Sequence, residues 1–179
     1  GLGHPDDEVF DVIDEILTDG LTSRLQTILV REKRIAASVG SDSNYPGVRA
    51  PNLFILTGTP LAPHTAAEVE AALYEELERL KKEPVPAKEL EKILNNIDAD
   101  LVRALRSNSG LASQLALYQT VAGDWRHVLK SRDKVAAVTA ADIQRVATRY
   151  FTKSNRTVGT LVKKANDKQM AGEIGRAHV

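Results

Sequence analysis

The sequence predicts an α+β fold, in which a small, mostly antiparallel sheet is covered on one face by helices. Three observations lead to this prediction. Segments with helical periodicity outnumber the strand-like segments, and the expected order is α, α, β, β, α, α, α, α, α, β. The two central strand segments are separated by roughly ten residues, for which antiparallel pairing is the simplest arrangement. Neither a regular strand–helix alternation nor a G-x-G-x-x-G loop is present.

The first sixty residues are expected to form two helices followed by the two central strands. Asp6 and Asp7 stand where a cap and first-turn negative charge belong, and Gly20 ends the first helix because glycine adopts the left-handed conformation without strain. The second strand is so continuously apolar that we expect both of its faces to be buried. The ranges are 6–18 and 22–33 for the helices, and 35–41 and 52–59 for the strands.

The rest of the chain is expected to be mostly helical. Thr139 and Asp142 have the spacing of a capping box, with aspartate in place of the usual glutamate. A final strand is expected where β-branched residues return near the end of the chain. The expected ranges are 65–82, 87–106, 111–121, 125–135 and 139–150 for the helices, and 156–162 for the strand.

At 179 residues the chain is expected to form one domain, over residues 1–163, followed by a tail over residues 164–179. The last seven residues, 173–179, back-translate naturally to GAG ATC GGA AGA GCA CAC GTC. This string resembles the start of a common sequencing-adapter oligonucleotide. Our hypothesis is that residues 173–179 are a library artefact, and we exclude them from reasoning about the fold.

Composition excludes several classes of function. Lys+Arg and Asp+Glu both number 24 and aromatic residues are 4%, so neither a basic stripe nor stacking aromatics favour nucleic-acid binding. No window approaches 18 consecutive apolar residues, so no membrane span is expected. The absence of cysteine rules out disulfides and thiolate metal sites, and fits any redox compartment.

The sequence predicts neither a catalytic residue nor a metal ligand. The histidines, at positions 4, 64, 127 and 178, are too far apart to share one helix face, as a two-histidine zinc site requires. The glutamates between residues 68 and 91 are interpreted as a solvated helix face. Trp125 and Tyr118 are interpreted as core or helix-packing aromatics.

Arg31 is the one residue singled out for binding. It lies at the end of the second predicted helix, just before the first predicted strand. A guanidinium in this place can donate to backbone carbonyls of the helix or of an extended peptide. The alternative is a cation that is simply favoured at a helix C-terminus.

Several segments, in order, resemble one family of peptidases. Residues 19–39 contain D-G-L-T-S-R-L, L-V-R-E-K and I-A-x-S-V with A at the variable position. Together with later segments they resemble the insulinase (pitrilysin) zinc peptidases and their relatives, the mitochondrial processing peptidases, and specifically the second, non-catalytic domain. The likeness covers about residues 4–163. The later segments are 72–80, 84–92, 109–116, 123–125, 138–147, 150–152 and 155–158.

This resemblance implies a metallopeptidase half-domain of the LuxS/processing-peptidase-like type. Its partner would be a homologous zinc-bearing N-terminal half or a partner subunit, and the two would close around a peptide substrate. Zinc would be held by an H-x-x-E-H motif in that other half, so this chain would carry no cofactor and would not be an enzyme on its own. The resemblance also implies that Arg31 contacts substrate, with Ala37 standing where the family often has a tyrosine.

The expected function is therefore the chamber wall and peptide-binding surface of a zinc metalloendopeptidase. Two alternatives stay open: a scaffold subunit of a catalytically dead relative, and an unrelated α+β binding module. Neither nucleic acid nor membrane is an expected partner. The compartment is not determined by the sequence, although export to the bacterial periplasm, common among relatives, is compatible with it.

Overall fold

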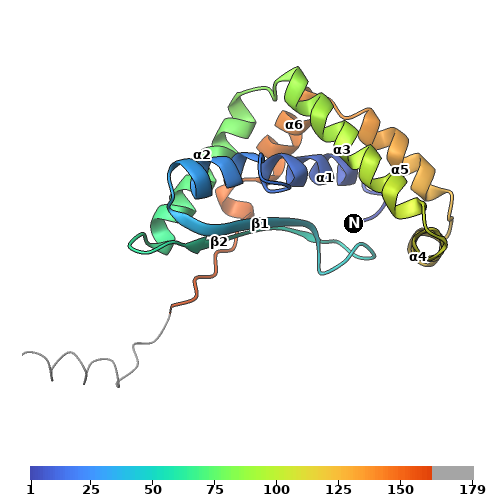
Figure 1. Ribbon diagram of the computed structural model, residues 1–179, viewed down its shortest axis with the longest axis horizontal. Helices are drawn as coiled ribbons and strands as arrows, with labels where there is room; N and C mark the ends of the chain where they lie inside the picture. The colour runs from blue at the N-terminus through green and yellow to red at the C-terminus, as the bar shows by residue number, and fades with distance from the viewer. Residues whose placement is uncertain (163–179) are drawn as a thin grey trace, which may run out of the picture.

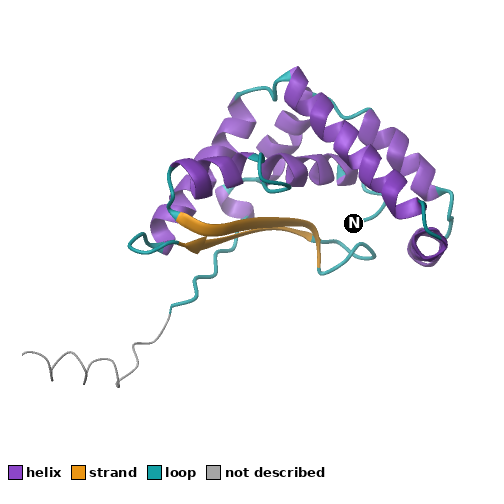
Figure 2. Ribbon diagram, viewed as in Figure 1, coloured by secondary structure: helices purple, strands orange, loops and turns teal. Residues whose placement is uncertain are grey.

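The computed structural model describes residues 1–162 and has the predicted α+β architecture. Helices lie on one side of a two-stranded antiparallel sheet within this part of the chain (Figures 1 and 2). The strands are β1 (Ala36–Tyr45) and β2 (Leu53–Pro60). The helices are α1 (Asp7–Leu17), η1 (Gln26–Glu32), α2 (Ala66–Lys82), α3 (Ala87–Leu105), α4 (Asn108–Ala122), α5 (His127–Ala136), α6 (Ala140–Tyr150) and η2 (Lys153–Asn155).

Helix boundaries follow the predicted signals closely. Capping boxes begin α2, through Thr65 and Glu68, and α6, through Thr139 and Asp142. Beyond the end of α1, Gly20 has the expected positive φ of 72°. Asp6 is the N-cap residue of α1, as predicted, but its side chain makes no capping bond to the helix and instead binds residues of α6.

The second helix is a π-helix. In η1 each backbone bond reaches one residue further back than in an α-helix, as in Lys33 N–H to the Ile28 carbonyl at 2.8 Å. The apolar spacing could not reveal this, because Leu25 and Leu29 are buried one turn apart in either geometry. After η1, Arg34 takes a left-handed φ of 52° and directs the chain into β1.

The sheet is more open than the apolar sequence of β2 predicted. Val39 pairs with Gly58 in the antiparallel register, as expected. The expectation that both faces of β2 are buried is wrong: Leu53 is 62% exposed, because helices cover only one face of the sheet. On that face α2 approaches so closely that a Cβ on Gly58 would lie 2.6 Å from Val69 Cγ1.

The predicted strand over residues 156–162 is also wrong. This segment has no strand pairing in the structure, and Leu161 is 95% exposed. One contact fixes its start, where the Arg156 guanidinium lies 3.9 Å from the ring centroid of Tyr74 on α2. Alternating apolar residues favour an extended backbone, but a strand also needs a partner for its backbone groups.

A single hydrophobic core joins α1, η1, β1, α2 and α6, with contributions from α3 and α5. It includes an aromatic cluster that the sequence did not predict, in which Phe10 lies 5.8 Å from Phe54 and 5.1 Å from Tyr150 between ring centroids. The predicted tail, residues 164–179, lies outside the described part of the chain. Among residues 1–162, no helix is long and apolar enough to cross a membrane.

Candidate functional site

The outer edge of β1 faces η1 and the end of α1. The Gln26 side-chain amide donates to the Val39 carbonyl at 3.3 Å, and the Ser41 backbone N–H donates to the Thr18 hydroxyl at 3.1 Å. Side chains therefore satisfy two backbone groups on this edge. At the start of β1 the pairing register with β2 shifts between Ala36 and Ser38. The exposed Ala37 therefore lies at an irregularity in the strand.

Arg31 lies in the last turn of η1, beside this edge, and is exposed. Its Nη1 donates to the Leu21 carbonyl at 3.4 Å, a long bond that uses one of the five guanidinium N–H groups. An open hollow of about 610 Å³ adjoins the guanidinium. The hollow is lined by Thr27, Val30, Arg31, Glu32 and Arg34. Both interpretations of Arg31 fit this placement, since the residue is at a helix end and already binds a backbone carbonyl.

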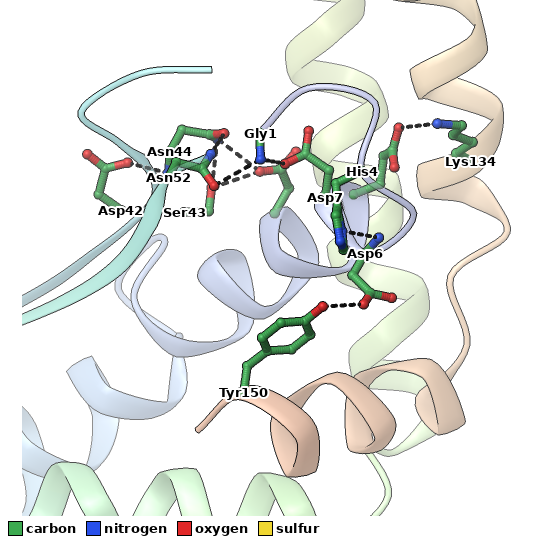
Figure 3. A network of polar contacts seen from close by, with 12 residues as sticks. Gly1, His4, Asp6, Asp7, Asp42, Ser43, Asn44, Asn52, Lys134 and Tyr150 are labelled. Atoms are coloured by element: carbon green, nitrogen blue, oxygen red, sulfur yellow. Dashed lines mark hydrogen bonds and ion pairs between the residues drawn. The ribbon is translucent and has the colours of Figure 1, made fainter. Parts of the chain in front are cut away.

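A second polar centre ties the start of α1 to α6. The Asp6 carboxylate is 2% exposed and accepts a hydrogen bond from Arg145 Nη1 at 2.7 Å. It also accepts one from the Tyr150 hydroxyl at 2.8 Å (Figure 3). Burial alone would raise the pKa of Asp6, but these two bonds outweigh it and the pKa is lowered. In the same region the buried Glu8 pairs with Lys134 of α5 at 3.0 Å. Both ion pairs join residues more than a hundred positions apart.

The face of α1 toward β1 is acidic. Asp11 accepts from the Ser43 hydroxyl at 2.7 Å, and Asp14 accepts from the Ser41 hydroxyl. Burial raises the pKa of both carboxyls despite these bonds. In residues 1–162, no group of three or more histidine, cysteine, aspartate or glutamate side chains is placed to hold a metal ion. This face therefore holds β1 against α1 and gives no support for a metal site.

Glu15 is the most strongly affected carboxyl on α1. Burial, followed by the neighbouring charges of Asp19 and Asp100, raises the pKa of Glu15 to about 8. The folded chain should therefore lose stability as the pH rises from the ordinary glutamate value of 4.5 towards 8, because proton loss then leaves another negative charge among carboxylates.

Replacing Glu15 by glutamine should remove this dependence. Since Glu15 is partly exposed, solvent screening reduces the effect, and we expect the variant to be more stable than the wild type by about 1 kcal/mol at pH 9 and nearly equal at pH 5. Urea denaturation at both pH values measures this difference. The matched control is Glu91→Gln on the exposed side of α3, which should change neither value. An equal effect of Glu15→Gln on stability at both pH values would contradict the raised pKa of Glu15.

The structure keeps the histidines of the described chain apart. His4 Nδ1 accepts from the Asp6 backbone N–H, His64 Nδ1 lies 3.4 Å from the Glu68 carboxylate, and the His127 ring stacks on Tyr118 at 5.6 Å. His178 lies outside the described residues. Tyr118 thus has the predicted helix-packing role, whereas Trp125, at 40% exposed, is not a core residue.

Comparisons with known proteins agree with this architecture. A model of the Peptidase M16 inactive domain matches residues 1–97. The chain is 30% identical over 154 residues to the zinc protease PqqE of Helicobacter pylori, covering 86% of this chain and 34% of that protein. The chain thus spans about a third of the length of this curated relative.

Solved structures give the same result. A protease from Helicobacter pylori superposes with a TM-score of 0.80 and 28% identity, over 87% of this chain and 37% of that one. The inactive peptidase domain of a putative zinc protease from Bordetella parapertussis superposes with a TM-score of 0.76 and 26% identity, over 89% of this chain and 85% of that one.

The family model covers more than half of the chain, and the structural matches extend the likeness through the later helices. The resemblance inferred from the sequence is therefore confirmed. The chain belongs to the family of M16 peptidase inactive domains.

Proposed function

We propose that this chain is the non-catalytic half of a zinc metalloendopeptidase, and that it forms the chamber wall opposite a zinc-bearing half. The observation that carries the proposal is the match of residues 1–97 to an inactive domain of a peptidase family. In this arrangement zinc would be held by the other half and would supply Lewis-acid chemistry for peptide hydrolysis there, while this half would bind the peptide. Membership in the family excludes the alternative of an unrelated binding module.

The test compares the isolated chain with the complete protein that contains it. Hydrolysis of an unfolded casein substrate is expected only for the complete protein, and a zinc chelator should abolish it. The isolated chain should hydrolyse nothing and should bind zinc no better than background in equilibrium dialysis. Hydrolysis by the isolated chain would overturn the proposal. A complete protein that folds but hydrolyses nothing would favour the scaffold alternative instead.

We further propose that Arg31 holds the backbone of the peptide. The residue is exposed, adjoins the open hollow on η1 and already donates to a backbone carbonyl, that of Leu21. An incoming extended peptide offers carbonyls of the same kind, and bonds from a charged donor to such groups are stronger than neutral ones. The absence of a tyrosine at Ala37 leaves this contact to the guanidinium alone.

Arg31→Ala is expected to lower kcat/KM of the complete protein about tenfold, as the loss of one charge-assisted hydrogen bond implies. Steady-state kinetics on an extended fluorogenic peptide measures this change. Because Arg31 is exposed, the melting temperature should shift by no more than about 1 °C. Arg49→Ala, an exposed arginine in the loop between β1 and β2, is the matched control. Equal activity of the two variants would show that Arg31 is only a favourable charge at a helix end.

A further inference from the structure

Helix α4 differs in composition from the other helices of the described chain, all of which contain charged residues. No charged residue occurs from Asn108 to Gly123, although charged residues make up 27% of the whole sequence. None of the residues of α4 is buried in the structure. A helix on the surface normally carries charged or polar residues on its outer side, so exposed leucines on an uncharged helix suggest that part of it is covered.

Several apolar side chains are exposed on and around α4. Leu111 is 41% exposed, Leu117 42% and Trp125, just after the helix, 40%. The helices that pack against α4 add Val102 of α3 and Leu129 of α5, which are 48% and 54% exposed. In Figure 1, α4 lies at the end of the molecule away from α2 and is coloured yellow. Its surroundings within the described chain are therefore α3 and α5.

The same surface contains a hollow of about 340 Å³, lined by Leu115, Ala116, Gln119 and Trp125. Polar contacts hold its wall in place. The Trp125 backbone N–H donates to the Gln119 side-chain oxygen at 3.3 Å, and the Arg126 guanidinium lies 4.6 Å from the centroid of the indole ring. The hollow is large enough for an apolar side chain to enter, and one wall is an aromatic ring, as at the centre of many protein interfaces.

We propose that this α4 face packs against the zinc-bearing half, which inserts an apolar side chain into the hollow. The α4 face is defined by Leu111, Leu115, Ala116, Gln119 and Trp125. The proposal rests on the proposed function, because it assigns a surface to the partner named there.

Two observations and one physical argument favour this occupant. The chain aligns with only 34% of PqqE and 37% of the solved Helicobacter pylori protease, so these relatives carry about two thirds of their length beyond the aligned domain. A half tethered in the same protein is present at high effective concentration and can cover a modest surface permanently. The residues of the α4 face are themselves uncharged and include an aromatic side chain, which is the composition of an interface core.

The absence of cysteine allows a direct test by thiol accessibility. Ala116→Cys places a thiol in the hollow, and Ala71→Cys places one on the exposed side of α2. Each variant is made in the complete protein, treated with a maleimide reagent, and analysed by mass spectrometry of the peptide that carries the position. We expect Cys modification at position 116 to be at least tenfold slower than at position 71 in the complete protein, and the two rates to be similar in the isolated chain.

Each outcome decides the proposal. Equal rates in the complete protein would overturn it. Protection of position 116 that already exists in the isolated chain and disappears on dilution would assign the face to a second copy, and protection that needs added phosphatidylcholine vesicles would assign it to a lipid surface; both overturn it. Hydrolysis is measured on the same samples. Protection without hydrolysis supports the docking and counts only against the proposed peptidase activity, so the two failures are distinguishable.

A second variant covers the case in which the isolated chain does not fold. Leu115→Glu in the complete protein should place a charge in the hollow and raise the modification rate at position 116 at least threefold. Ala71→Glu, on the exposed side of α2, is the control and should leave that rate unchanged. An unchanged rate with Leu115→Glu would overturn the proposal without any measurement on the isolated chain.

Discussion

Replacing Asp6 by asparagine is expected to lower the free energy of unfolding by about 2 kcal/mol, because the change removes the charge from a buried carboxylate that accepts two hydrogen bonds. The carboxylate is 2% exposed, and accepts from Arg145 and Tyr150. Arg149 adds a third contact at 3.7 Å. Asparagine keeps the size of the side chain, so the loss measures charge and hydrogen bonding. The two arginines are about half exposed or more, and water can solvate them after the change.

The pH dependence of this loss has a defined sign. The pKa of Asp6 is lowered in the folded chain, so its ionised form stabilises the fold above the ordinary aspartate value of 3.8. That contribution is lost as the pH falls further, through the lowered pKa. The wild type should therefore lose stability in acid more steeply than Asp6→Asn, and the two should approach each other below the ordinary value.

Urea denaturation of both proteins at pH 7 and at pH 3 measures the effect. The matched control is Asp133→Asn on α5, an exposed aspartate whose loss should cost less than about 0.5 kcal/mol. If Asp6→Asn cost no more than this control at pH 7, the polar centre between α1 and α6 would not contribute to stability.

Asp6 also shows where reasoning from the sequence stopped. Its position just before an amphipathic segment fits a helix cap, and local patterns alone favour that role. Its actual partners lie 139 and 144 residues further along the chain. No local pattern encodes such a pair, so only the packed fold could reveal that Asp6 is the buried centre of a network.

The elements with strong local signals were predicted well. Apolar spacing predicted α1, a capping box predicted the start of α6, and Gly20 predicted the turn after α1. The errors arose where the structure of a segment depends on the elements that pack beside it. Apolar content alone predicted that β2 would be covered on both faces and that residues 156–162 would pair, but coverage and pairing depend on which elements lie alongside.

The candidate site was predicted in part. Arg31 was placed at the end of a helix and before a strand, as the structure has it. The π-helical geometry of η1, the left-handed Arg34 and the hollow between them were not predicted, because the buried spacing of η1 is the same in an α-helix. A charge-free run over α4 was visible in the sequence, but its meaning depends on exposure, which only the structure provides.

Truncation of Ile143 to alanine is expected to lower the free energy of unfolding by about 3 kcal/mol, the usual cost of deleting a large buried aliphatic side chain. Ile143 is fully buried on α6, a helix that packs against α1 and α2. The family model ends at residue 97, before α6 begins, so this position lies outside the matched segment. The shared core nevertheless predicts that residues 98–155 belong to the same cooperative unit as residues 1–97.

Two spectroscopic probes in one urea titration test whether residues 1–97 and 98–155 unfold together. Far-ultraviolet circular dichroism follows all helices, whereas fluorescence follows Trp125, the single tryptophan, which lies between α4 and α5. Their transitions should coincide in the wild type, and Ile143→Ala should shift both midpoints equally. The control Gln144→Ala, next to it on the partly exposed side of α6, should shift them by much less. A fluorescence transition that stays in place while the other moves would mean that α3, α4 and α5 unfold separately, and the one-domain interpretation would then be wrong.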